Sequence, residues 1–267
     1  MTDQSKNDSE RHHLDEIRLR LWQRRLAIEA EAAIRDTING RPKPYRETPR
    51  VLLARRVLKL FGLFNRGVRN VANLQLNLQT LYCEQLPAVF HGFRILLLSD
   101  FHFSGDRPFI DRVCALIQRV QVDVCVMTGD YRYSRRAPQW DLYEGMEAVL
   151  RCVRAKFGVV GVFGNNDTSD MLAPFRALGV HMLVNQPLEI RKDGASLWFG
   201  GVDDPHEYRC SDLPCAFDGV PPGAFRLLLA HSPELTAEAA ALGVDVYLCG
   251  HTHGGQIAQI GRASCRE

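Results

Sequence analysis

The 267-residue chain lacks a long apolar run, a CxxC pair and an apolar leader. No uncharged apolar run approaches the roughly 18 residues that a membrane-spanning helix needs, so we expect no such helix. The first thirteen residues, MTDQSKNDSERHH, are polar and do not resemble a secretory signal peptide. Eight cysteines without paired spacing are typical of free thiols in a reducing compartment. We therefore expect a cytoplasmic protein.

Charge of one sign is not in excess either. The 33 Lys and Arg residues against 31 Asp and Glu residues give a formal net charge of +2. This balance excludes a globally basic nucleic-acid binder, though not a local basic patch, and we expect no specific nucleic-acid partner. Hydrophobic residues at 46% and charged residues at 24% are ordinary values for a globular chain with a buried core.

The first 73 residues predict a helical extension with one basic amphipathic stretch. Residues 8 to about 38 have the periodicity of a helix, whose role the sequence does not reveal. Residues 50–70 contain six basic residues and no acidic one. At about 100° per residue, Arg55, Arg56, Lys59 and Arg66 share one stripe opposite most of the apolar side chains. Such a helix either contacts the anionic surface of the inner membrane, or packs its apolar side on the domain and leaves its basic side in solvent.

Strand patterns begin at residue 74, where Leu74, Leu76 and Leu78 alternate with polar residues as in a half-buried strand. Strands separated by helices indicate parallel βαβ units. Asp193-Gly194 predicts a hairpin turn, and the stretch 203–224 predicts a long surface loop. The expected strands are 93–99, 122–128, 157–163, 180–184, 187–191, 196–200, 225–230 and 244–249, and the expected helices are 108–120, 139–154, 169–178 and 233–242.

Five polar motifs each follow a buried strand run. Because the carboxyl ends of parallel strands lie along one edge of a sheet, we expect the motifs to converge there. Each alone is weak evidence, since a single Asp-x-His or Gly-Asp is more often a turn. Carboxylates, imidazoles and an amide oxygen without a thiolate favour Mn, Fe, Zn or Mg. The motifs are Asp100-Phe101-His102, Gly129-Asp130, Gly164-Asn165-Asn166-Asp167, His231-Ser232 and Gly250-His251-Thr252-His253-Gly254-Gly255, which leave His12, His13, His91, His181 and His206 without a role.

The order SDFH…GDY…GNND…AHSPE…GHTHGGQ resembles the calcineurin-like metallophosphoesterases, and most closely their bacterial branch, over residues 74–259. The resemblance implies a four-layer α/β/β/α sandwich with two divalent ions at one edge, manganese being favoured. It implies hydrolysis of a phosphoester or phosphoanhydride by metal-hydroxide attack. Asp130, Asn166 and Asp167 would be catalytic. By the same resemblance Asp100, His102 and His253 would hold the first metal, Asn165, His231 and His251 the second, and Asp130 would bridge both.

One residue departs from the family pattern. Asn166 stands where the family usually has a histidine that stabilises or protonates the leaving oxygen, and an amide cannot donate that proton. A stable leaving group needs little protonation, which favours a phosphoanhydride or an aryl ester. The UDP-2,3-diacylglucosamine pyrophosphatases resemble this chain there. The substrate would be a phosphorylated small molecule or a lipid-linked one, a phosphodiester among them.

Two alternatives to an enzyme stay open. Asn166 and the early end of the chain are also compatible with a non-catalytic metal-binding scaffold at the membrane periphery. The basic stretch could itself be the functional element, as an anchor for a membrane or a nucleic acid. Residues 260–267, IGRASCRE, read like an in-frame translation of a sequencing-adapter oligonucleotide. We therefore expect a non-native tail there, and a phosphoesterase domain, 74–259, that is incomplete at its C-terminus.

Overall fold

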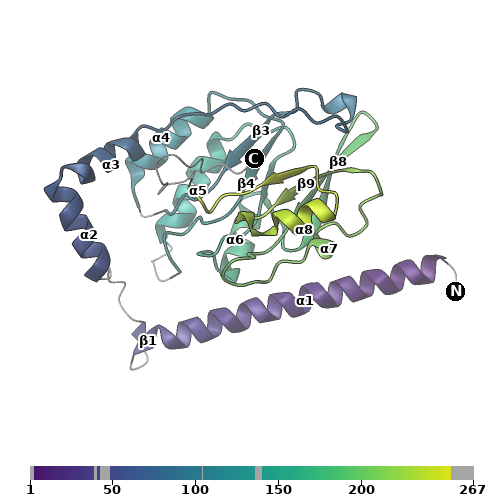
Figure 1. The fold of residues 1–267 in the computed structure, drawn as a ribbon, viewed down its shortest axis with the longest axis horizontal. Coiled ribbons are helices and arrows are strands. Elements are labelled where there is room, and N and C mark those ends of the chain that lie inside the picture. The colour runs from purple at the N-terminus through teal and green to yellow at the C-terminus, as the bar shows by residue number, and fades with distance from the viewer. Residues whose placement is uncertain (1–2, 39–40, 43–48, 104, 136–139, 254–267) are drawn as a thin grey trace.

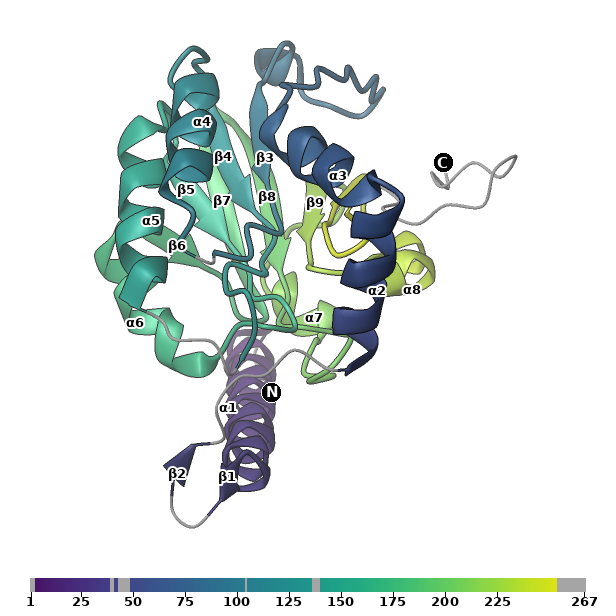
Figure 2. The ribbon, with the colours of Figure 1, turned by 90° about the vertical axis from the view of Figure 1, so that its left-hand side faces the viewer.

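The computed structural model describes residues 3–38, 41–42, 49–103, 105–135 and 140–253. Two four-stranded sheets lie face to face, and helices cover both outer faces (Figures 1 and 2). This arrangement confirms the predicted four-layer α/β/β/α fold. The stretch 260–267 and the glycines at 254 and 255 lie outside the described residues.

The first sheet is parallel throughout, in the order β3-β4-β5-β6. Its central strand β4 is buried at all four residues, because helices cover one face of the sheet and the second sheet covers the other. That double burial explains why its sequence, VCVM, is apolar without alternation. The strands are β3 (Ile95–Leu98), β4 (Val124–Met127), β5 (Val159–Gly161) and β6 (Val180–Met182), and the covering helices are α4 (Arg107–Ile117), α5 (Trp140–Cys152) and α6 (Leu172–Ala177).

The second sheet has the order β10-β9-β8-β7 and is parallel except for the β7–β8 hairpin. Asp193 and Gly194 form the hairpin turn with positive φ angles of 47° and 82°, which a type I′ turn requires. One core lies between the sheets and another lies under α7 and α8. The elements are β7 (Gln186–Lys192), β8 (Ala195–Gly201), α7 (Leu213–Ala216), β9 (Phe225–Leu229), α8 (Thr236–Ala241) and β10 (Val246–Leu248).

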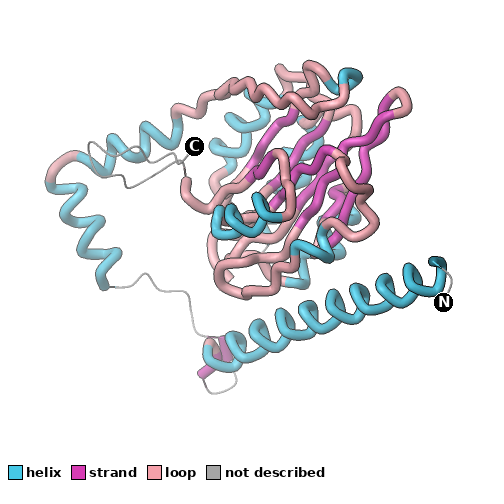
Figure 3. Tube along the Cα trace, turned by 45° about the vertical axis from the view of Figure 1, so that its right-hand side comes forward, coloured by secondary structure: helices cyan, strands magenta, loops and turns pink. Residues whose placement is uncertain are grey.

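Helix α1 (Asp3–Arg35) is a long rod that lies against the sandwich (Figures 1 and 3). Arg18 joins it to the domain by donating to the carbonyl oxygens of Asn185 and Cys215, at 2.9 and 2.7 Å. The Trp22 ring stacks on Phe163 with the ring centroids 6.5 Å apart. Among the described residues, no helix is both long and apolar enough to cross a bilayer. Short elements complete the fold: β1 (Thr37–Ile38), β2 (Arg41–Pro42) and the 3₁₀ turns η1 (Ala88–Phe90), η2 (Ser169–Met171) and η3 (Pro233–Leu235).

The single helix predicted for residues 50–70 is wrong. The structure has two helices there, α2 (Pro49–Leu60) and α3 (Leu63–Ala72), separated at Gly62. Gly62 has φ +69°, which glycine adopts without a Cβ clash and which ends α2. No residue of α2 is buried, so the alternative in which its apolar side packs on the domain is also wrong.

Two further predictions differ from the structure. Residues 74–79 form no strand, and Leu78 is 93% exposed, because alternation makes a strand only where another strand pairs with it. The 203–224 segment is not a surface loop. It contains α7 and buries Tyr208, Cys210 and Phe217. The Asp204 carboxylate accepts hydrogen bonds from the backbone N–H groups of residues 206–208, which lets the segment lie inside the protein.

Candidate metal centre

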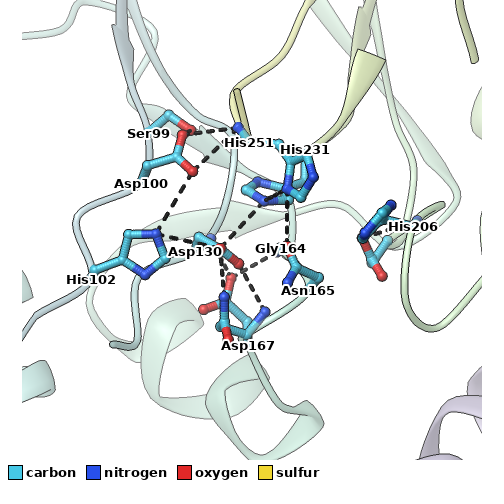
Figure 4. A network of polar contacts seen from close by, with 12 residues as sticks. Ser99, Asp100, His102, Asp130, Gly164, Asn165, Asp167, His206, His231 and His251 are labelled. Carbon is cyan, nitrogen blue, oxygen red and sulfur yellow. Dashed lines mark hydrogen bonds and ion pairs between the residues drawn. The ribbon is translucent and has the colours of Figure 1, made fainter. Parts of the chain in front are cut away.

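Polar side chains from both sheets meet at one edge of the sandwich (Figure 4). Asp100, Asp130 and Asn165 follow β3, β4 and β5, whereas His231 and His251 follow β9 and β10. All five strands are parallel to a neighbour in their own sheet, and their carboxyl ends bring these side chains together.

The first group consists of Asp100, His102 and His253, whose possible ligand atoms all lie within 4.8 Å of one another. The Nε2 atoms of His102 and His253 are 3.2 Å apart. His253 Nε2 is 3.3 Å from Oδ1 of Asp100. Ser99 Oγ donates to the other oxygen of Asp100 at 2.6 Å, which orients this carboxylate.

The second group consists of Asn165, His231 and His251. Nδ1 of His251 lies 3.2 Å from Oδ1 of Asn165 and 3.2 Å from Nε2 of His231. An amide oxygen and two ring nitrogens therefore face a common point. This donor set suits a borderline divalent ion.

Asp130 lies between the two groups. Its Oδ2 atom is 3.6 Å from Nε2 of His102 and 3.4 Å from Nε2 of His231. The backbone N–H of Asn166 donates to Oδ1 at 2.8 Å, and the Asn166 side-chain amide donates to Oδ2 at 2.7 Å. Asn166 therefore holds the Asp130 carboxylate in place.

The tautomers of two histidines are set by backbone carbonyl groups, which only accept hydrogen bonds. Nδ1–H of His102 donates to the carbonyl of Arg132 at 3.1 Å, and Nδ1–H of His231 donates to that of Thr128 at 2.7 Å. Each neutral ring therefore directs the lone pair of Nε2 into the cluster, as metal-ligating histidines do. The facing ring nitrogens and the carboxylates fit a pair of divalent cations.

Burial and charge shift the pKa values inside the cluster. Burial alone would raise the pKa of Asp130, but the hydrogen bond and charge of His231 lower it below its ordinary value. Burial opposes the charged form of His231, yet Asp130 outweighs it and raises the pKa of His231 to about 9. Burial and then the charge of His231 lower the pKa of His251. In the metal-free protein a proton on His231 compensates the Asp130 carboxylate.

The backbone is unusual at the cluster. Asp100, His102, Asp130, His251 and His253 all have positive φ angles, between 44° and 68°. Such angles are uncommon for residues other than glycine and gather at functional sites. A Cβ added at Gly164 would collide with the backbone N and the carboxylate of Asp130, so only glycine lets the two loops approach this closely.

Asp167 lies beneath the cluster and is fully buried. Its carboxylate accepts hydrogen bonds from the backbone N–H groups of Asp130, Tyr131 and Gly164, at 2.8, 2.9 and 2.7 Å. Burial, followed by the charge of Asp130, raises the pKa of Asp167 to about 6. Through these backbone groups the carboxylate joins the loops after β4 and β5, so its contacts are those of a positioning residue.

Two residues near the site had no role in the sequence analysis. The His206 ring lies 4.6 Å from that of His251, centroid to centroid, and its Nδ1 is 2.5 Å from Oε1 of Glu234. Arg25, on α1, is fully buried against Asp167. His206 follows Asp203 and Asp204 after β8, and this position after a strand could have identified it as a candidate site residue. No local sequence pattern identifies Arg25 in this way.

Comparison with known proteins identifies the family to which the chain is similar. The sequence model of the calcineurin-like phosphoesterase superfamily domain matches residues 93–265. Two vertebrate proteins named transmembrane protein with metallophosphoesterase domain are similar. The one from Bos taurus is 29% identical over 195 residues, 65% of this chain and 43% of its own. The one from Danio rerio is 27% identical over 232 residues, 80% of this chain and 51% of its own.

A bacterial relative is similar as well. The phosphodiesterase YaeI of Escherichia coli is 27% identical over 174 residues, 62% of each protein. The chain spans about half the length of the two vertebrate relatives.

Proposed function

Because the chain belongs to the calcineurin-like phosphoesterase superfamily, we propose that it hydrolyses a phosphoester or phosphoanhydride with two divalent metal ions. Asp100, His102 and His253 would hold one ion, and the other would lie among Asn165, His231 and His251. The observation that carries the proposal is the position of Asp130, one of whose oxygens lies within 3.6 Å of ring nitrogens from both groups.

Each part of the site has a distinct task in this proposal. The chemistry that two divalent ions supply is polarisation of the phosphoryl group and activation of water. In their neutral form the histidines would present unprotonated nitrogens to the ions, and backbone carbonyls fix the rings of His102 and His231. The Asp130 carboxylate would be shared by the two ions. The Asn166 side chain donates a hydrogen bond to this carboxylate, and the backbone N–H of Asp130 donates to the Asp167 carboxylate.

The substrate class follows from Asn166. Its side-chain amide is engaged with Asp130 and carries no proton that it could transfer to a leaving alkoxide. We therefore propose a substrate whose leaving group is stable as an anion, namely a phosphoanhydride or an aryl-like phosphodiester. A lipid-linked pyrophosphate of the UDP-diacylglucosamine kind fits this requirement, as does a phosphorylated small molecule.

Turnover of bis(p-nitrophenyl) phosphate with added Mn²⁺ tests the activity. Asp130→Asn should lower kcat by at least the roughly 10²-fold typical of lost electrostatic stabilisation in an active site. Asp123→Asn is a matched control, because Asp123 precedes the same strand at its other end and accepts the Arg94 N–H at 2.8 Å. Equal loss in both variants would contradict the assignment. Wild-type protein that binds Mn²⁺ without turnover of this ester or of a UDP-linked pyrophosphate would favour the scaffold alternative.

We also propose that helices α2 and α3 contact an anionic membrane at its surface. Figure 3 shows α2 standing out from the sandwich. Nine apolar side chains of the segment are 42–81% exposed: Val51, Leu52, Leu53, Val57, Leu58, Leu60, Phe61, Leu63 and Val68. The six basic residues of the same segment are unaccompanied by any acidic one. Exposed apolar area beside unbalanced positive charge fits the headgroup region of an anionic bilayer.

Sedimentation with vesicles of phosphatidylglycerol and phosphatidylcholine tests this contact without any metal. Arg55→Glu with Arg56→Glu should weaken binding at least tenfold, because each basic residue near the surface contributes about 1 kcal/mol. Arg151→Glu with Arg176→Glu makes the same change in net charge on α5 and α6. Binding that is insensitive to salt, or equal in the two variants, would overturn the membrane contact.

A further inference from the structure

We infer that helix α1 is a positioning element of the metal centre, acting through Arg25 and Glu29 on residues 164–169. The inference rests on the proposed function, because it concerns the same site. It gives a role to a helix whose sequence alone shows none.

Arg25 is the largest fully buried side chain among the described residues. Its guanidinium group donates to three acceptors in three separate parts of the chain: Nη1 to the Asp203 carboxylate, Nη2 to the Asp167 carbonyl at 2.6 Å, and Nε to Glu29 at 3.0 Å. The group also lies over the rings of Phe163 and Tyr208, at 4.7 and 3.9 Å from the centroids. Only the planar fork of arginine can satisfy this arrangement.

Glu29, one turn further along α1, makes a second connection to the same loop. Its carboxylate accepts hydrogen bonds from the backbone N–H of Ser169, at 2.9 Å, and from the Ser169 hydroxyl. Arg25 and Glu29 therefore hold both ends of the segment from Asp167 to Ser169, and they also pair with each other.

The candidate ligand Asn165 and its neighbour Asn166 directly precede this segment. The Asp167 carbonyl faces α1, where it accepts from Arg25 and from the Tyr208 hydroxyl at 2.6 and 3.1 Å. Its carboxylate faces the other way and accepts the backbone N–H groups of Asp130 and Gly164. Asn165 and Asn166 lie between Gly164 and Asp167, whose backbone groups these hydrogen bonds hold. A shift of α1 would therefore move Asn165 relative to Asp130.

Stability alone does not explain these contacts. A buried ion pair such as Arg25–Asp203 is often no more stabilising than apolar residues of similar volume. Arg18 holds the same helix to the domain through Asn185 and Cys215, and among the described residues its hydrogen bonds reach none of residues 164–169. Arg25 instead directs Nη2 at the backbone carbonyl of Asp167, next to the candidate ligands, as groups that orient metal ligands do.

Calorimetric titration of metal-free protein with Mn²⁺ tests the inference. Arg25→Met combined with Asp203→Asn avoids an unpaired buried carboxylate, and it should weaken binding of the more weakly held ion roughly 10–100-fold, as outer-shell substitutions do. Hydrogen exchange of the amides of residues 164–169 should accelerate in the metal-free variant. Arg18→Met, the matched control, should change neither quantity more than about twofold.

Glu29→Ala is a second variant in case the double variant does not fold, because it removes the Ser169 contact and leaves Arg25 paired with Asp203. It should accelerate exchange at residues 164–169 and weaken the second ion. Unchanged Mn²⁺ affinity and exchange in a folded variant would overturn the role of α1. Wild-type protein that binds no second ion would instead contradict the proposed function, so the two failures are distinct.

Discussion

The Asp130–His231 pair should make the stability of the metal-free protein depend on pH. Burial opposes the charge on His231, but Asp130 raises the pKa of its imidazole to about 9, against about 6.5 in an unfolded chain. The folded state therefore binds this proton more tightly than the unfolded state does. The stabilisation is fully present below pH 6.5, declines as the pH rises and is lost above about pH 9.

The size of the effect follows from the shift. One pKa unit corresponds to 1.36 kcal/mol, so the shift from about 6.5 to about 9 corresponds to about 3 kcal/mol. No discount for solvent screening applies, because His231 is fully buried. The shift already includes the interaction with Asp130, whose lowered pKa is the other side of the same pair.

Urea unfolding with a chelator present, from pH 6 to pH 9.5, measures this contribution. The free energy of unfolding of wild-type protein minus that of His231→Gln should fall by about 3 kcal/mol between pH 6.5 and pH 9. Buried thiols such as Cys125, whose pKa burial raises to about 12, also titrate on unfolding. They are present in both proteins and cancel in the difference. Parallel curves for the two proteins would refute a charged Asp130–His231 pair.

Metal binding should reverse this protonation. A histidine must be neutral to bind a metal ion, so loading at pH 7.5 should release about one proton from His231. Calorimetry in two buffers that differ in ionisation enthalpy measures the number released. The apparent affinity should rise with pH up to about 9, where His231 is already neutral.

Three further substitutions, one of them with a matched control, have defined outcomes. Gly164→Ala should lower the free energy of unfolding by about 1–3 kcal/mol in urea, whereas Gly67→Ala, in α3 with no atom near its added Cβ, should raise it by up to about 1 kcal/mol. Asn166→His should raise the rate on alkyl phosphodiesters relative to the rate on nitrophenyl esters by up to about 10²–10⁴-fold; equal effects on both would remove the argument for a stable leaving group. Asp204→Ala removes the acceptor of three backbone N–H groups and should cost about 2–3 kcal/mol; an unchanged midpoint in thermal unfolding would contradict its role in holding the segment 203–224.

The sequence by itself determined the fold class and the place of the candidate site. Apolar runs separated by helical patterns predicted parallel βαβ units, and polar motifs after the runs predicted one common edge. Both features can be recognised in short stretches of sequence. A strand buried on both faces, such as β4, must be apolar throughout, and the carboxyl ends of parallel strands all lie on the same side of the sheet. The order of these motifs led to the resemblance over residues 74–259, which then supplied the four-layer arrangement and the expected division of the candidate ligands between two metals.

Only the tertiary structure decided which distant side chains support that edge. Arg25 and Asp203 are 178 residues apart, and no periodicity relates a buried guanidinium group to a carboxylate at that separation. The position of His206 against His251 depends on how residues 203–224 fold, which Asp204 determines through backbone hydrogen bonds. The 74–79 alternation failed for a similar reason, because a strand forms only where a partner strand lies beside it. Periodicity reports which face of an element is apolar, whereas the partner of that face depends on the rest of the chain.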